Sequence, residues 1–426
     1  MSTNKPLLIL IISTVFLLTA KSQPVNTVCT ENVSVKNIRT VLFYQKGNEL
    51  SMPNIQLDSD EKLVLKFDDL DNEVKDYYYS ITHCTRDWKK SDVNTSFYSK
   101  GFNDNQIMDY EYSFNTLVPY VNYTLELPND DMSILKSGNY IIDIYTKDNG
   151  NQIKITKRFT VYEPLTKVKV KCTRPLDASM YNSGQELYLE IDENPTYITN
   201  PYSQLFVSIL QNGDWNNRID LDKPDFLRDG KVIYNNSEKI VFDAGNEFRY
   251  VDLKNEKYNS ERIKNTTIIN DYYFTMLHDD LDMLFEPYFY SRDINGKYLV
   301  KRDTYDNSHV EADYVFVHFT LNYNKQITLG KPYLYGALTN WDCNGNNQMK
   351  WNPEIEKYEL TIMLKQGYYN YKYVTKLPND VIKQSIFSGS HYETQNLYNV
   401  YIYLTDLSYN YDRLICTSVV NSNKTE

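Results

Sequence analysis

Residues 367–374 read Gly-Tyr-Tyr-Asn-Tyr-Lys-Tyr-Val, and this stretch has the two-residue period of a β-strand. Tyr369, Tyr371 and Tyr373 fall on one face, with a polar residue between each pair on the other, because successive side chains of a strand point to opposite sides. The pattern predicts a strand that presents a row of aromatic rings to a core.

The same short pattern recurs along the chain, and long helical patterns are absent. Further predicted strands lie at 63–67, 140–145, 205–210 and 358–364. Turn signals rich in Gly, Asn and Ser flank several of them, as expected for hairpins. Regular short strands with frequent turns predict an all-β fold of immunoglobulin-like β-sandwiches stacked along the chain.

The length of 426 residues suits several small domains rather than one. We predict three consecutive β-sandwiches after a cleaved signal peptide. The divisions are a signal peptide at 1–22, an N-terminal sandwich at 33–164, a middle sandwich at 165–305, a C-terminal sandwich at 310–416 and a frayed tail at 417–426. The first boundary falls at Glu163–Pro164 between two strands, and the second falls in a polar stretch without apolar periodicity.

The N-terminus has the pattern of an export signal. Lys5 supplies a positive start, the apolar run Leu7–Leu18 follows, and Ala20-Lys21-Ser22 offers small residues where a signal peptidase cuts. We place the cut before Gln23. The alternative is a membrane anchor, but the apolar run is shorter than the ~20 residues that span a bilayer.

Composition excludes some partners. The formal charge is −11, so the surface repels the phosphates of nucleic acid and gives no reason to expect binding to anionic membranes. No later segment is apolar enough to span a membrane as a helix, so we expect no direct membrane insertion. The oligomeric state stays open.

Cysteine and histidine are both dispersed, and neither has the spacing of a metal or cofactor site. We therefore predict no metal and no cofactor. We interpret the cysteines as buried thiols, although an exported protein can oxidise a pair, and the pairing stays open. The five cysteines are Cys29, Cys84, Cys172, Cys343 and Cys416.

No catalytic constellation stands out, and we predict that the chain is not an enzyme. Acidic pairs occur at Asp68–Asp69, Asp130–Asp131 and Asp279–Asp280. Paired carboxylates serve glycosidases, which makes a glycosidase a third function to consider. We interpret the pairs instead as solvated acids in turns at the ends of strands.

The C-terminal region resembles the glycogen-binding carbohydrate module. The resemblance rests on 333–341, which ends Thr-Asn-Trp, and on Gln-Gly-Tyr-Tyr-Asn-Tyr-Lys-Tyr at 366–373. It implies that Trp341 stacks on a sugar ring and that Lys372 hydrogen-bonds to it. The module's second Trp is missing after Val374, so the implied glycan site is degenerate. The other interpretation of Trp341 is a structural aromatic that closes the end of the sandwich.

A wider resemblance covers about residues 38–413. Its strings include Phe-Asp-Asp-Leu-Asp at 67–71, Tyr-Tyr-Tyr-Ser-Ile-Thr-His-Cys at 77–84, Asp-Tyr-Glu-Tyr-Ser-Phe-Asn-Thr at 109–116, Ile-Leu-Gln-Asn-Gly-Asp-Trp at 209–215, Asp-Ile-Asn-Gly-Lys-Tyr at 293–298 and Gly-Ser-His-Tyr-Glu-Thr at 389–394. In order and coverage these strings resemble the exported family of Bacteroidota that includes the type IX secretion plug protein.

The wider resemblance implies a non-enzymatic periplasmic protein that plugs the periplasmic end of the large outer-membrane translocon barrel. The barrel is then the expected partner. Tyr and Trp are enriched at interface hot spots, which makes Trp88, Trp215 and Tyr110 candidate contacts, although burial in a core explains each equally well. The alternative function is a periplasmic or surface glycan-binding protein that uses Trp341 and Lys372.

Overall fold

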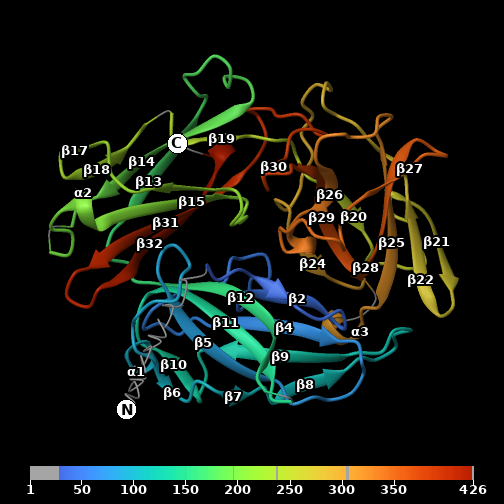
Figure 1. The fold of residues 1–426 in the computed structure, drawn as a ribbon, viewed down its shortest axis with the longest axis horizontal. Coiled ribbons are helices and arrows are strands. Elements are labelled where there is room, and N and C mark those ends of the chain that lie inside the picture. Colours follow the sequence, from blue (N-terminus) through green and yellow to red (C-terminus); the bar gives the residue numbers. More distant parts are fainter. Residues whose placement is uncertain (1–27, 149, 195, 237, 304–306, 425–426) are drawn as a thin grey trace, which may run out of the picture.

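The computed structural model describes residues 28–148, 150–194, 196–236, 238–303 and 307–424, in which strands far outnumber helices (Figure 1). The predicted all-β fold is confirmed. The helices in these ranges are single turns: α1 (Thr95–Tyr98), α2 (Pro201–Gln204), α3 (Ser308–Glu311), η1 (Ala337–Thr339) and η2 (Ser422–Lys424). The predicted signal peptide at 1–22 lies outside the described residues.

Two facing sheets from the N-terminal part form what we name the first sandwich. One sheet contains β1 (Asn32–Val33), β12 (Gln152–Tyr162), β11 (Gly138–Thr146), β5 (Tyr78–Cys84) and β7 (Asn105–Gln106), with β3 (Asn54–Gln56) beside β12. The other contains β2 (Ile38–Gln45), β4 (Leu63–Asp69), β9 (Val121–Leu127) and β8 (Asp109–Tyr112). A small ribbon pairs β6 (Ser99–Gly101) with β10 (Met132–Ile134).

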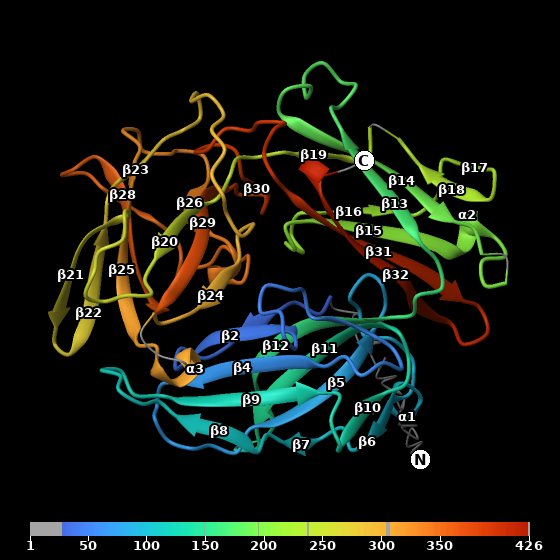
Figure 2. The same ribbon diagram turned by 180° about the vertical axis from the view of Figure 1, so that it is seen from behind.

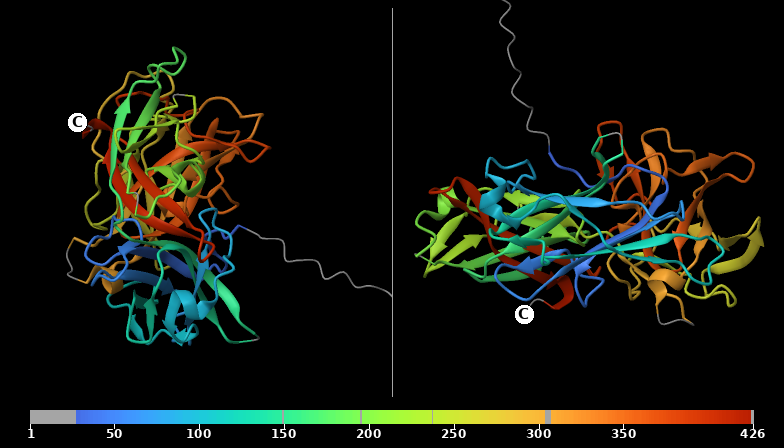
Figure 3. Two further views of the ribbon diagram at one scale, coloured as in Figure 1. Left: turned by 90° about the vertical axis from the view of Figure 1, so that its left-hand side faces the viewer. Right: turned by 90° about the horizontal axis from the view of Figure 1, so that it is seen from below.

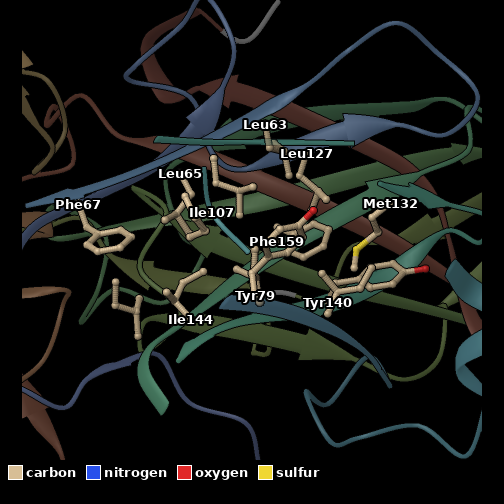
Figure 4. Close-up of a cluster of buried hydrophobic side chains, with 14 of the residues drawn as sticks. Leu63, Leu65, Phe67, Tyr79, Ile107, Leu127, Met132, Tyr140, Ile144 and Phe159 are labelled. Carbon is tan, nitrogen blue, oxygen red and sulfur yellow. The ribbon is translucent and has the colours of Figure 1, made fainter. Parts of the chain in front are cut away.

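Alternation along these strands builds the first core. Leu63, Leu65 and Phe67 of β4 project from one sheet toward Tyr140 of β11 and Phe159 of β12 (Figure 4). Each of the five side chains is 1% exposed or less. The rings of Tyr140 and Phe159 stack with their centroids 5.1 Å apart, so aromatic contact adds to simple burial.

A second sandwich follows, built from both the middle and the end of the chain. One sheet contains β13 (Val168–Thr173), β14 (Gly184–Asp192), β18 (Lys231–Tyr234) and β17 (Phe226–Arg228), with β19 (Val241–Asp243) beside β14. The facing sheet runs β16 (Arg218–Leu221), β15 (Leu205–Gln211), β31 (Leu397–Asp406) and β32 (Tyr411–Asn421).

The strands of a third sandwich lie, in sequence, between these two parts of the second. One sheet contains β20 (Arg249–Asp252), β29 (Gly367–Lys376) and β24 (Tyr298–Val300), with β26 (Lys331–Tyr335) and β30 (Ile382–Lys383) also beside β29. The other contains β21 (Ile263–Ile269), β22 (Tyr272–Leu277), β25 (Tyr314–Asn322), β28 (Lys357–Lys365) and β27 (Lys350–Asn352), with β23 (Asp280–Leu281) beside β25. Tyr369, Tyr371 and Tyr373 face its core, as their alternation predicts.

The predicted boundary at 305–310 is wrong, because it cuts through the third sandwich. β20, before the boundary, pairs with β29, and β22 pairs with β25. β31 and β32, placed by prediction in the C-terminal sandwich, instead complete the second sandwich through β15. Alternation in a sequence identifies strands but not their neighbours.

The predicted frayed tail at 417–426 is also wrong over most of its length. β32 runs to Asn421, and Thr417 to Asn421 stay in register with β31. Pairing uses backbone N–H and C=O groups, which polar residues carry as well as apolar ones.

The three sandwiches form a triangle. The first lies along the bottom of Figure 1, and the second and third lie side by side above it, an arrangement that the reverse view in Figure 2 repeats. Figure 3 shows the second and third on the same side of the first. The chain passes from the first to the second at Glu163–Leu165 and crosses twice between the second and the third. The described chain has no direct connection between the first and the third.

Candidate functional site

The first and third sandwiches meet at a buried ion pair. The Lys365 ammonium at the end of β28 donates to the Asp68 carboxylate of β4 at 2.6 Å, and neither side chain is more than 1% exposed. Asp68 also accepts hydrogen bonds from the Tyr314 hydroxyl at 2.6 Å and the Asn122 amide at 2.7 Å. A carboxylate removed from water is tolerated only with such partners.

The surroundings of Lys365 keep the pair fixed. Burial lowers the pKa of the Lys365 ammonium, and the attraction of Asp68 opposes that shift. The ammonium also donates to the His309 carbonyl and lies 4.1 Å from the centroid of the Tyr120 ring. Burial beside Asp68 raises the pKa of the Tyr314 hydroxyl well above its ordinary value, so Tyr314 stays a donor. Asp68, Lys365 and their hydrogen-bond partners therefore hold the first and third sandwiches together.

A second set of polar contacts extends this junction. The Asp313 carboxylate before β25 accepts the backbone N–H groups of Leu117 and Val118 from the first sandwich. In return, the Tyr120 hydroxyl of the first sandwich donates to the Ala312 carbonyl at 2.8 Å. These hydrogen bonds together fix the position and the orientation of the first sandwich relative to the third.

The first and second sandwiches are joined by charge and by tryptophan. The Arg413 guanidinium donates two hydrogen bonds to the Glu163 carboxylate. This bidentate pair lies where the chain passes from the first sandwich to the second. Trp88 and Trp215 meet edge to face with ring centroids 4.7 Å apart. The Arg158 guanidinium lies 4.7 Å from the Trp88 ring centroid, a cation–π distance.

The second and third sandwiches meet at a buried carboxyl group, Asp214, which is attracted by the Lys372 ammonium but forms no ion pair at salt-bridge distance among the described residues. The Tyr335 hydroxyl of β26 donates to the Asp214 carboxylate at 2.7 Å, and Asp214 is 2% exposed. Burial raises the pKa of Asp214 to about 6, and the hydrogen bond from Tyr335 only partly opposes that shift. Beside it, the Asn216 amide donates to the Trp341 carbonyl at 2.6 Å.

Parts of all three sandwiches line one pocket, among them Lys157 of the first, Trp215 of the second and Asn340 of the third. The Lys157 ammonium of β12 donates to Glu31 at 2.9 Å and to Asn340 of the third sandwich at 2.8 Å. Lys297 of the third sandwich donates to the Leu50 carbonyl of the first, and burial lowers the pKa of Lys297 to about 8. A groove of about 550 Å³ runs from here between the first and third sandwiches. No group of three or more His, Cys, Asp or Glu among the described residues is placed to hold a metal.

Trp341 and Lys372, the predicted glycan-binding residues, lie in one cluster. The Trp341 ring meets Tyr335 and Phe248 edge to face at centroid distances of 5.5 and 6.1 Å. The Lys372 ammonium donates to Gln384 and lies 4.6 Å from the centroid of the Phe248 ring. Both side chains are engaged by protein groups, so this geometry does not favour the glycan-binding alternative.

Two of the three acidic pairs are not the solvated turns that we predicted. Asp68 and Asp69 are fully buried at the end of β4, and Asp280 is 1% exposed. The Asp280 carboxylate accepts the hydroxyl groups of Tyr371 and Tyr373. The missed signal was position: Asp68 and Asp69 continue an apolar strand rather than follow it. Asp130–Asp131 is exposed, as predicted.

The three candidate contact residues differ in their exposure to solvent. Trp88 is buried and Trp215 is half-buried against it, whereas Tyr110 is 42% exposed. Tyr110 belongs to β8, which lies at the edge of its sheet and whose four residues are all exposed. Around it Met108, Tyr112 and Phe114 are 73%, 56% and 62% exposed. We name Met108, Tyr110, Tyr112 and Phe114 the β8 surface.

This architecture defines a class of all-β proteins built from packed β-sandwiches. None of the helices in the described residues is long and apolar enough to cross a membrane. Residues 38–163 match the family model described as the type 9 secretion system plug protein 1st domain. This stretch therefore corresponds to the first domain of the plug-protein family, a component of a secretion system.

A solved structure shares nearly the whole fold. A hypothetical protein from Parabacteroides merdae ATCC 43184, known from its crystal structure, is 31% identical to this chain and superposes with a TM-score of 0.89. The alignment covers 93% of this chain and 100% of that one. No curated protein matches the chain.

Proposed function

We propose that this protein sits in the periplasm and plugs the periplasmic end of the outer-membrane barrel of the type IX translocon. The observation that carries the proposal is the joining of three sandwiches into one body, above all through the buried Asp68–Lys365 pair. A barrel wide enough for folded cargo leaks solutes when it is open. A stopper must keep its shape against that opening.

Rigidity also favours docking. A body whose parts are already fixed loses little conformational freedom when it binds, so more of the contact energy appears as affinity. The contacts between Asp313 and the first sandwich, and between Arg413 and Glu163, fix the sandwiches before any partner arrives. These contacts support a preassembled plug and not one that folds on the barrel.

The β8 surface is the contact that we assign to the barrel. In the described residues β8 pairs only with β9, so its other edge offers backbone N–H and C=O groups to a further strand. Tyr110 and Tyr112 project from one face of that edge. An exposed edge with aromatic anchors suits docking by strand addition to a β-rich rim.

Deleting the gene tests the function. We expect the deletion to raise outer-membrane permeability to large hydrophilic compounds, and we expect a tagged copy of the protein to copurify with the translocon. Re-expression of the wild-type chain is the control. Unchanged permeability together with no copurification would reject the proposal.

Surface variants test the assignment of the contact. Tyr110→Ser with Tyr112→Ser should reduce copurification and lower the unfolding midpoint only modestly. Both rings are largely at the surface, although the Tyr110 ring also contacts the buried Tyr123 ring at a centroid distance of 5.9 Å. Tyr202→Ser is a matched control, since Tyr202 is 43% exposed but lies in the second sandwich. Equal recovery of barrel with both variants would place the contact elsewhere on the plug.

A further inference from the structure

The segment before β1 is held against the first sandwich. Val28 forms a bridge with Lys89, and the Cys29 N–H donates to the Trp88 carbonyl at 2.7 Å. The Arg158 guanidinium donates to the Cys29 carbonyl from two nitrogens. Cys29 is therefore fixed by its backbone on both sides, and its side chain is half-buried.

Cys84 lies directly beside it. It ends β5, where it pairs with Asn139 of β11, and it forms a bridge with Lys90. Its side chain is fully buried in a cluster with Trp88 and Ile141, and Cys29 packs against that cluster. Both thiols therefore belong to one packed group around Trp88. Burial, and the neighbouring Cys29, raise the pKa of the Cys84 thiol.

The other cysteines lie in other clusters. Cys172 and Cys416 belong to the core of the second sandwich, and Cys343 packs with Tyr333 and Tyr335 of the third. Cys84 directly precedes the turn that contains Trp88, and Cys29, far away in sequence, hydrogen-bonds to the Trp88 backbone. Their meeting explains how an odd cysteine count is compatible with one specific pair.

We propose that Cys29 and Cys84 form an intramolecular disulfide in the exported protein. The two thiols lose two protons and two electrons as the S–S bond forms. A protein disulfide of the periplasmic thiol-oxidising class accepts the electrons and protons and is reduced to two thiols. The inference goes beyond plugging but rests on the periplasmic location proposed above.

The bond would act where the three sandwiches converge. Glu31, two residues after Cys29, accepts the Lys157 ammonium and the Arg158 N–H. Lys157 in turn reaches Asn340 of the third sandwich. A covalent link from Cys29 to β5 would therefore keep this segment, and with it the Lys157 contact, from separating.

Thiol mapping tests the proposal. The full chain, exported to a periplasm, is purified, treated with iodoacetamide in denaturant without reductant, digested and measured by mass spectrometry. We expect a linked pair of peptides that contain Cys29 and Cys84, and alkylation of both only after reduction. Cys343 is the internal control and should alkylate directly. Direct alkylation of Cys29 and Cys84 would overturn the proposal.

Two further measurements test the geometry of the thiol pair and the effect of the bond on stability separately. The reduced, folded chain treated with oxidised glutathione should give the same linked peptides, and failure there would show that the geometry is wrong whatever the compartment. Reductant should lower the thermal midpoint of the wild type but not of Cys29→Ser/Cys84→Ser, and an unchanged wild-type midpoint counts against the proposed role of the bond. Permeability is measured separately, so a failed disulfide leaves plugging to be judged by itself.

Discussion

Two junctions of the same molecule handle a buried carboxylate in different ways. Between the first and third sandwiches, Asp68 is neutralised by Lys365. Between the second and third, Asp214 has only neutral donors at hydrogen-bond distance, among them Tyr335, and its pKa rises to about 6. The first arrangement fixes a charge, and the second leaves a group that titrates.

Chain connectivity explains the difference. The chain crosses twice between the second and third sandwiches, so the backbone itself holds them together. The described chain has no direct crossing between the first and third, and Asp68 and Lys365 are 297 residues apart in sequence. That junction depends entirely on side chains and backbone contacts, and its strongest contact is deeply buried.

The largest effect is expected from breaking the charged junction. Lys365→Met leaves Asp68 buried without its cation, which should lower the free energy of unfolding by about 3–5 kcal/mol. Urea unfolding measures the loss. Lys357→Met is the matched control, because Lys357 pairs with Asp279 at the surface and should change stability by less than about 1 kcal/mol.

A double variant sharpens this result. Asp68→Asn with Lys365→Met removes both charges, and it should recover part of the loss, because no unpaired charge stays buried. Equal stability of Lys365→Met and Lys357→Met would show that the buried pair does not hold the junction.

Backbone geometry at the second–third junction should give the next effect. Gly296 has φ +77° in a turn behind Trp341, and a Cβ there would lie 2.3 Å from the Trp341 ring. Gly296→Ala combines a strained φ with overpacking and should cost about 2–4 kcal/mol. Gly345→Ala, with nothing within 4 Å of its Cβ, is the control. Similar unfolding curves for the two variants would contradict the close contact.

The sequence revealed the strands but not their partners. Alternation at Tyr369, Tyr371 and Tyr373 predicted a buried face, because that signal is local. The pairing of β31 with β15 joins residues almost two hundred positions apart and leaves no local trace. The same holds for the junctions: nothing beside Asp68 in sequence indicates that Lys365 will neutralise it.

The pH response should distinguish the two carboxylates. The pKa of Asp214 is about 6 in the folded protein and is near its ordinary 3.8 when unfolded. The folded state therefore binds the proton more tightly, and the contribution to stability falls as pH rises from about 4 to about 6, then stays constant. The total change should be about 2–3 kcal/mol.

Asp214→Asn isolates this response. Unfolding of the wild type and the variant is measured from pH 4 to pH 8. The difference between them is followed, so that the contributions of other titrating groups cancel, such as Glu247, whose pKa burial raises to about 7. We expect wild-type stability to fall relative to the variant between pH 4 and pH 6. A constant difference over that range would contradict the raised pKa of Asp214.

The smallest effect should come from the polar contact at the edge of the second–third junction. Asn216→Ala removes the hydrogen bond to the Trp341 carbonyl and should cost about 0.5–1.5 kcal/mol. Amide hydrogen exchange around Trp341 should accelerate, whereas exchange around Asp68 should not change. Asn346→Ala, at an exposed position in a nearby loop, is the control. Faster exchange at both junctions would mean that the three sandwiches open as one unit. Faster exchange around Trp341 alone would mean that the second–third junction opens more easily than the first–third junction.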